Sequence, residues 1–153
     1  MFLEVINHFV PEVFKTMAGL SASPSKGNAN APQPCTLSGI SGSVGLSGRL
    51  NGVVYTAFSH SLARMVTEKI LGGSASEPEI NDVVAELTNM ITGNLKSMLC
   101  DRGYNSTLTI PSVVRGESIA ISAKSACISV AGTFTVEGCA DPLIVHAFAA
   151  LEN

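Results

Sequence analysis

Two side chains that could act together, those of Glu86 and Asn89, stand three positions apart in the longest segment with a helical apolar repeat. A carboxylate can bind a cation through a charge-assisted hydrogen bond, and an amide can donate and accept hydrogen bonds at once without titrating. Residues three positions apart share one side of a helix, so a single ligand could meet both groups. This pair is the principal candidate for a functional site.

The helix around the pair fixes the direction in which it points. Apolar residues recur at i, i+3, i+4 and i+7 and define a buried face: Ile80, Val83, Val84, Leu87, Ile91, Leu95 and Met98. A helix completes a turn about every 3.6 residues, so the opposite face carries a second set of residues. We name this set the polar stripe: Asp82, Glu86, Asn89, Gly93 and Ser97. We expect the polar stripe to be exposed.

Two residues of the polar stripe are unfavourable for helix formation and are therefore unexpected on a helix face that only contacts solvent. The side chain of Asn89 competes for backbone hydrogen bonds, and Gly93 is less favourable than alanine by roughly 1 kcal/mol in a helix interior. A bare glycine near longer polar side chains lets the backbone of another molecule come close. The stripe therefore predicts a docking surface, against two alternatives: an ordinary solvated face, or a Gly93 that only packs against a neighbouring loop.

Two other motifs have structural interpretations. Glycines recur at every third position: Gly39, Gly42, Gly45 and Gly48. A nucleotide loop needs a strand-to-helix turn, whereas these glycines lie in strand-like sequence, which favours bends in a hairpin. Ser59, His60 and Ser61 could suggest a nucleophile, but no G-x-S-x-G elbow surrounds them and helix capping explains both serines.

The possible metal ligands are scattered along the chain. The four cysteines form no C-x-x-C pair, which indicates reduced and mostly packed thiols: Cys35, Cys100, Cys127 and Cys139. His8 and His146 lie far apart with no ligand spacing around them. We therefore expect no metal site and no cofactor bound by the chain itself.

Composition excludes several classes of partner. The 153 residues carry a formal net charge of -3, and the nine Lys and Arg form no basic run, so nucleic acid is not an expected partner. No apolar run reaches the roughly 18 residues that cross a bilayer, which argues against membrane insertion. The N-terminus has no early Lys or Arg, unlike a signal peptide, and this predicts a cytoplasmic protein.

The order of the predicted elements indicates one α+β domain over residues 1–153, an antiparallel sheet with helices packed on it. Residues 21–34 are small, polar and Pro-rich and are expected to form a flexible loop. Before them, Asn7 would cap a helix to about Ala18, with Pro11 in its first turn. The other elements follow in order: a hairpin over 36–59, a helix from Ser59 or Ser61 to Gly72, the long helix from Ser76 to about Cys100, and strands within 106–114, 118–123, 126–138 and 142–151.

The segment D82-V-V-A-E86-L-T-N89-M-I-T-G93-N94 resembles the signature of the CheC, CheX and FliY phosphatases of bacterial chemotaxis, in which Glu-x-x-Asn is the catalytic pair. The likeness covers most of the chain and is nearest to CheX. It includes FKTMAG at 14–19, GVVYTAF at 52–58, GGS at 72–74, and Pro111 with VVRG downstream at 113–116.

This resemblance implies a CheX-like fold and a phosphorylated CheY-like response regulator as partner, carrying an aspartyl phosphate and its own Mg²⁺. Glu86 would pair with the active-site lysine of the regulator, and Asn89 would hold a water in line with phosphorus. Asp82 and Gly93 match flanking signature positions and would support docking. The alternative is a non-catalytic module that binds a regulator, or a flagellar or receptor component, through the same surface.

CheC-like relatives carry a second copy of the signature on the first helix. Here that helix offers Glu12-Val13-Phe14-Lys15, where Lys15 replaces the amide. One active site per chain, as in CheX-like members, is therefore expected. The resemblance also implies a possible homodimer paired through sheet edges.

Overall fold

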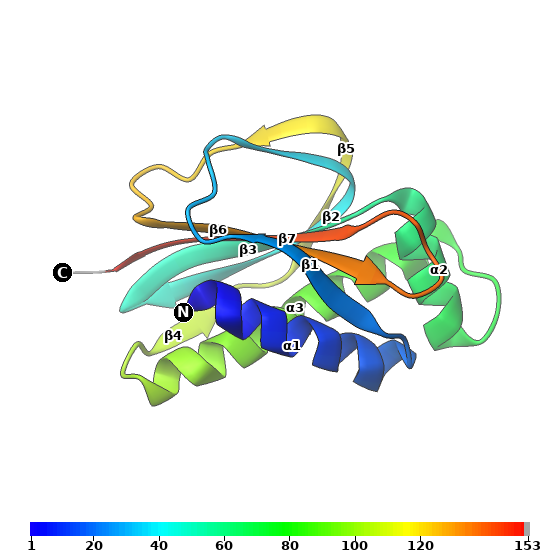
Figure 1. Ribbon diagram of the computed structural model, residues 1–153, viewed down its shortest axis with the longest axis horizontal. Coiled ribbons are helices and arrows are strands. Elements are labelled where there is room, and N and C mark those ends of the chain that lie inside the picture. Colours follow the sequence, from blue (N-terminus) through cyan, green and yellow to red (C-terminus); the bar gives the residue numbers. More distant parts are fainter. Residues whose placement is uncertain (152–153) are drawn as a thin grey trace.

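Three helices pack against an antiparallel sheet of seven strands in the computed structural model, which describes residues 1–151. Helices α1 and α3 lie side by side along one face of the sheet, and α2 lies near one end (Figure 1). The helices are α1 (Phe2–Ala18), α2 (His60–Leu71) and α3 (Glu77–Asp101). The strands are β1 (Ala22–Asn28), β2 (Cys35–Gly48), β3 (Leu50–Phe58), β4 (Ser106–Leu108), β5 (Ser112–Ile121), β6 (Ile128–Val136) and β7 (Leu143–Leu151).

The strands follow the order β1-β6-β7-β3-β2-β4, and β5 pairs with β2 next to β4. Each pairing is antiparallel. The predicted hairpin over 36–59 is the β2–β3 pair, in which Ile40 faces Phe58 and Leu46 faces Gly52. The α+β class expected from the sequence is confirmed.

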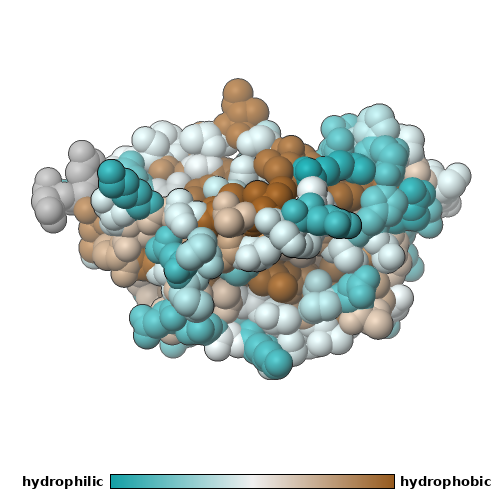
Figure 2. Space-filling model, turned by 90° about the horizontal axis from the view of Figure 1, so that it is seen from above, coloured by the Kyte–Doolittle hydropathy of each residue, from teal (hydrophilic) through white to brown (hydrophobic). Residues whose placement is uncertain are grey.

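The main core lies between the helices and the sheet. Its largest fully buried side chains include Phe14, Phe58 and Phe134. Side chains alternate between the two faces of a strand, so a smaller apolar cluster forms on the other face of the sheet: Cys35, Leu37, Ala57 and Phe148. Figure 2 looks down on that side, where hydrophobic residues show between hydrophilic ones.

Residues 22–28, expected within a flexible loop over 21–34, form the edge strand β1 instead. Only Ala22 of this strand is buried, so its sequence carries no apolar alternation that would indicate a strand. Its backbone pairs with β6, with a register shift between Pro24 and Lys26. Proline is tolerated on an edge strand, where an amide need not donate to a neighbour. The loop prediction was wrong for residues 22–28, because the strand depends on backbone pairing, whereas residues 29–34 form no helix or strand.

Helix α1 begins earlier than the sequence predicted. It starts at Phe2, after an N-cap at Met1 that makes no side-chain hydrogen bond, rather than at an Asn7 cap. Phe2, Val5 and Ile6 are buried and extend the apolar face of the helix towards its N-terminus. Pro11 consequently lies in the helix interior and not in the first turn, so burial of this apolar face outweighs the missing cap and the unfavourable proline.

Helices α2 and α3 begin at the predicted caps. The hydroxyl of Ser59 accepts a hydrogen bond from the Leu62 amide at 3.0 Å, and α2 ends at Gly72 in the left-handed conformation. Ser76 and Glu79 form a reciprocal capping box at the start of α3, with hydrogen bonds of 2.9 and 3.3 Å. Such a box satisfies two amides that a helix N-terminus leaves without partners.

Close packing fixes α3 on the sheet. The hydroxyl of Thr88 shares a buried hydrogen bond of 2.6 Å with that of Thr56 on β3. On β2, a Cβ atom at Gly42 would overlap the Thr88 side chain, so glycine at this position lets the helix lie close to the strand. The register of α3 against β2 and β3 is therefore set by Gly42, Thr56 and Thr88.

Candidate functional site

The polar stripe lies on the side of α3 that faces away from the core. Asp82, Glu86 and Ser97 are exposed, and Asn89 and Gly93 are half-buried. The buried side of α3 comprises Ile80, Val84, Leu87, Thr88, Ile91, Thr92, Leu95 and Leu99. Val83 and Met98, predicted as buried, are only partly so. The apolar repeat thus predicted the direction of Glu86 and Asn89, and missed the two buried threonines because their packing depends on the sheet.

Glu86 and Asn89 have free polar ends within residues 1–151, since neither side chain makes a hydrogen bond or ion pair with that part of the chain. Glu77 and Glu79 in the first turn of the same helix are engaged, Glu79 in the capping box and Glu77 with basic side chains. A carboxylate and an amide one helical turn apart are therefore available to another molecule.

Gly93 is not required by the packing of the described chain. A Cβ atom there would meet only the Cδ1 atom of Leu108 on β4, at 4.0 Å, which is an ordinary contact. The loop-packing alternative therefore supplies no steric reason for glycine. The glycine is explained if the backbone of another molecule approaches at this point.

A hollow of 330 Å³ adjoins the polar stripe on its α1 side. Residues from all three helices line it: Met17, Ile70, Asp82, Val83, Glu86 and Leu87. We name it the three-helix pocket. The sequence pattern did not find it, because Met17 and Ile70 come from other helices and reach α3 only in the folded chain.

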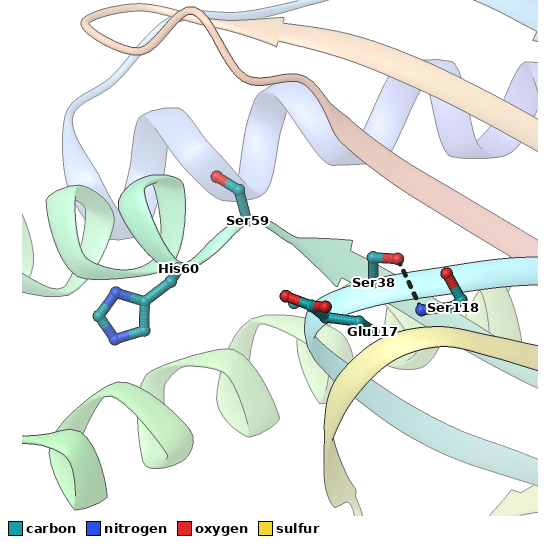
Figure 3. Close-up of a pocket in the computed structure, with 6 residues that line it drawn as sticks. Ser38, Ser59, His60, Glu117 and Ser118 are labelled. Carbon is teal, nitrogen blue, oxygen red and sulfur yellow. Dashed lines mark hydrogen bonds between the residues drawn. The ribbon is translucent and has the colours of Figure 1, made fainter.

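A second hollow, of 490 Å³, lies at the junction of β2, β5 and α2. Figure 3 shows Ser59 and His60 there with their side chains directed apart, while the Ser38 hydroxyl accepts a hydrogen bond from the Ser118 amide at 3.0 Å. Because the Ser59 hydroxyl caps α2, a serine–histidine nucleophile does not form at this hollow.

The ring of His60 belongs instead to an ionic cluster at the start of α3. Its Nε2 atom lies 2.6 Å from the Glu77 carboxylate. The same carboxylate contacts Arg115 of β5 at 3.1 Å and Arg64 of α2 at 3.4 Å. The hydrogen bond with His60, followed by that from Arg115, holds the pKa of Glu77 below its ordinary value. We name these four residues the Glu77 cluster. It joins α2, β5 and the first turn of α3.

The first helix offers a weak counterpart to the stripe. Glu12 lies 3.6 Å from His8 and lines a hollow of 210 Å³ with Met90 and Asn94 of α3, and Lys15 is exposed. A lysine cannot accept a hydrogen bond from water as an amide does, so this helix lacks the chemistry of the Glu86 and Asn89 pair.

Among residues 1–151, no group of three or more His, Cys, Asp or Glu side chains is arranged to hold a metal ion. In the same part of the chain, no helix is long and apolar enough to cross a membrane. The four cysteines are free thiols, and burial raises the pKa of Cys35.

Comparison with known proteins identifies the family. The family model described as chemotaxis phosphatase CheX matches residues 40–135, a span that includes α3 and the polar stripe. This chain therefore belongs to the CheX family, as the sequence resemblance implied. A search of curated protein sequences gives no match.

Solved structures share the fold over almost the whole chain. A CheC-like superfamily protein from Shewanella sp. PV-4 has 28% identity and a TM-score of 0.83, covering 97% of each chain. The chemotaxis protein CheX from Vibrio vulnificus has 25% identity and a TM-score of 0.84, covering 97% of this chain and 99% of the other.

A third similar structure is a CheX–CheY–BeF3–Mg²⁺ complex from Borrelia burgdorferi. Its identity is 20% and its TM-score 0.76, covering 100% of this chain and 99% of that chain. At this identity the likeness shows the fold alone.

Proposed function

We propose that this chain accelerates hydrolysis of the aspartyl phosphate of a CheY-type response regulator, with Glu86 and Asn89 as the acting residues. The observation that carries the proposal is the presentation of a carboxylate and an amide, one turn apart and free of partners within residues 1–151, on a helix anchored in the core on its other side. Membership of the CheX family supports the same reaction class.

The chemistry needs position more than reactivity. An acyl phosphate is already labile, so what an attacking water lacks is placement in line with phosphorus. The amide of Asn89 can accept a hydrogen bond from that water while donating another, whereas a carboxylate there would be repelled by the phosphoryl oxygens. We therefore assign to Asn89 the role of positioning the attacking water.

Glu86 is assigned to docking. Its carboxylate, one helical turn from Asn89, can form a charge-assisted hydrogen bond with the active-site lysine of the regulator. Asp82 and Gly93, on the same stripe, support the contact: Asp82 through its exposed carboxylate and Gly93 by leaving room for the partner's backbone.

The metal of the proposed reaction belongs to the regulator. The Borrelia burgdorferi complex contains CheY, BeF3 and Mg²⁺, which is consistent with magnesium entering with the partner. We place the reaction in the cytoplasm, where a CheY-type regulator would meet the chain. The homodimer suggested by the resemblance stays a prediction.

Replacing Asn89 with alanine tests the proposed mechanism. We expect Asn89→Ala to keep the fold and to lower the saturating rate of regulator dephosphorylation by at least about 100-fold, because the water loses its orientation. Phosphate release from phosphorylated CheY-type regulators of the same genome is the measurement. Asn30→Ala, at an exposed asparagine in the turn after β1 and away from α3, is the control and should retain activity. Unchanged release by Asn89→Ala would remove the mechanism.

Replacing Glu86 tests the docking role. Glu86→Ala should raise the half-saturation concentration of phosphorylated regulator by roughly 10- to 100-fold, since hydrogen bonds to charged groups contribute about 1.5–3 kcal/mol. The saturating rate should change far less. Glu117→Ala, an exposed glutamate on β5, provides the control. A fall in saturating rate with unchanged half-saturation would contradict the assignment.

The same assay separates a phosphatase from a non-catalytic binding module. Saturating binding of a phosphorylated regulator with no faster phosphate release would favour the module.

A further inference from the structure

The three-helix pocket has apolar walls and an acidic rim. Met17 of α1, Ile70 of α2 and Val83 and Leu87 of α3 provide the walls, while the only charged lining residues, Asp82 and Glu86, both come from the polar stripe. Neither carboxylate forms an ion pair within residues 1–151. The pocket and the proposed docking surface therefore share two residues.

The three-helix pocket is a surface hollow between helices that pack on the core. Met17, Ile70 and Val83 contact the main core and are partly buried, yet 330 Å³ between them stays open. Ligand pockets begin at roughly 300 Å³. The space is thus sufficient for a side chain of another protein.

A separate recess lies between α1 and α3. This recess, of 210 Å³, is lined by the apolar residues Phe9, Val13 and Met90 and the polar residues Glu12, Thr16 and Asn94. Apolar side chains therefore run beside the polar stripe on the α1 side over more than one helical turn.

We propose that the three-helix pocket receives an aliphatic side chain of the response regulator, from the segment next to the lysine that Glu86 binds. This inference rests on the proposed function and extends its docking surface. An apolar cavity edged by two carboxylates is complementary to an apolar residue beside a cation, and it disfavours an acidic segment.

The position of the pocket determines which step it serves. Its α3 residues, Asp82 to Leu87, precede Asn89, so an occupant lies beside the catalytic contact and not over the reacting phosphorus. Burial of an aliphatic side chain against apolar walls favours the complex. The pocket should therefore set affinity and the orientation of α3 in the complex, and leave the saturating rate nearly unchanged.

Two polar substitutions on different helices test this proposal. Val83→Gln on α3 and Met17→Gln on α1 are each checked for a cooperative thermal transition. Binding is then measured to CheY-type regulators of the same genome that have been activated with beryllium fluoride and Mg²⁺. We expect each folded variant to bind at least fivefold more weakly than the wild type, with a saturating rate of phosphate release within twofold.

Val114→Gln is the matched control. Val114 is 42% exposed on β5, and its neighbour Arg115 is directed towards α3. Successive side chains of a strand point to opposite faces, so Val114 points away from that helix. This variant should bind as the wild type does.

The outcomes separate this inference from the proposed function. If the wild type accelerates phosphate release and both pocket variants bind within fivefold of it, the pocket proposal is overturned and the phosphatase stands. If the pocket variants lose binding but the wild type does not accelerate release, the pocket proposal is supported and the phosphatase is overturned. If no activated regulator binds the wild type, both are overturned.

Discussion

At the residue scale, Gly93 makes its own helix less stable than alanine would, without a steric reason within the described chain. Alanine in a helix interior is more favourable than glycine by roughly 1 kcal/mol. The described chain has room for the extra methyl group, because the nearest atom, on Leu108, would lie 4.0 Å from it. Neither the stability of α3 nor its packing within the described chain therefore explains a glycine at position 93.

Replacing Gly93 should separate stability from docking. Gly93→Ala is expected to raise the free energy of unfolding by about 0.5–1 kcal/mol, measured by urea denaturation. It should also weaken binding to the activated regulator, because the methyl group occupies space proposed for the partner's backbone. A more stable variant with unchanged affinity would show that no backbone approaches at Gly93.

At the residue scale, the sequence predicted the members of the stripe but not their surroundings. An apolar repeat of about 3.6 residues determines which side chains of one helix face outward. Glu86, predicted to face outward, is exposed. The partly buried state of Val83 and the pocket beside it depend on Met17 and Ile70, which lie on other helices. No local pattern contains that information.

At the element scale, helix α3 holds the stripe through its contacts with β2 and β3. The Thr56–Thr88 hydrogen bond and the close approach at Gly42 both act on the buried side, across the helix from Glu86. A substitution on that buried side should therefore shift the position of the polar stripe, although none of the residues of the stripe is replaced.

Replacing Gly42 tests this anchoring. The Cβ atom of Gly42→Ala would overlap Thr88, so α3 must shift or the sheet must yield, at a loss of about 1–3 kcal/mol in the free energy of unfolding. Urea denaturation is the measurement, and the regulator assay should show reduced activity. Gly73→Ala, where no atom lies within 4 Å of the added Cβ, is the control. Equal stability of the two variants would contradict the proposed close packing.

Elements with their own local signals were predicted well. α2 and α3 carry capping residues and an apolar repeat, and they begin at Ser59 and Ser76 as expected. β1 and the start of α1 lack such signals: β1 depends on backbone pairing with β6, and α1 extends to Phe2 because burial of its first turns replaces a cap. Tertiary context decided both differences.

At the scale of the whole molecule, the fold brings together groups from distant parts of the sequence. The Glu77 cluster joins α2 to α3 through His60 and Arg64, and β5 to α3 through Arg115, which also donates to the Asn81 side chain at 2.8 Å. The cluster therefore connects the start of the helix that carries the stripe to two other elements.

This connection should depend on pH in a definite direction. The pKa of Glu77 is lower in the folded chain than its ordinary value of 4.5, so the folded state binds a proton less readily than the unfolded chain. The stability that Glu77 supplies is therefore complete above about pH 4.5 and is lost as the pH falls below it. Replacing the carboxylate with an amide should remove this dependence.

Glu77→Gln tests the prediction by urea denaturation at about pH 7 and about pH 3. The wild type should be more stable than the variant at the higher pH, and the difference should shrink at the lower pH because protonation neutralises the wild-type carboxyl. Titration of distant groups cancels in the comparison, since both proteins share them. Glu4→Gln, an exposed glutamate in the first turn of α1, controls for loss of a surface charge. A difference that stays constant with pH would mean that the Glu77 cluster does not stabilise the junction of α2, α3 and β5.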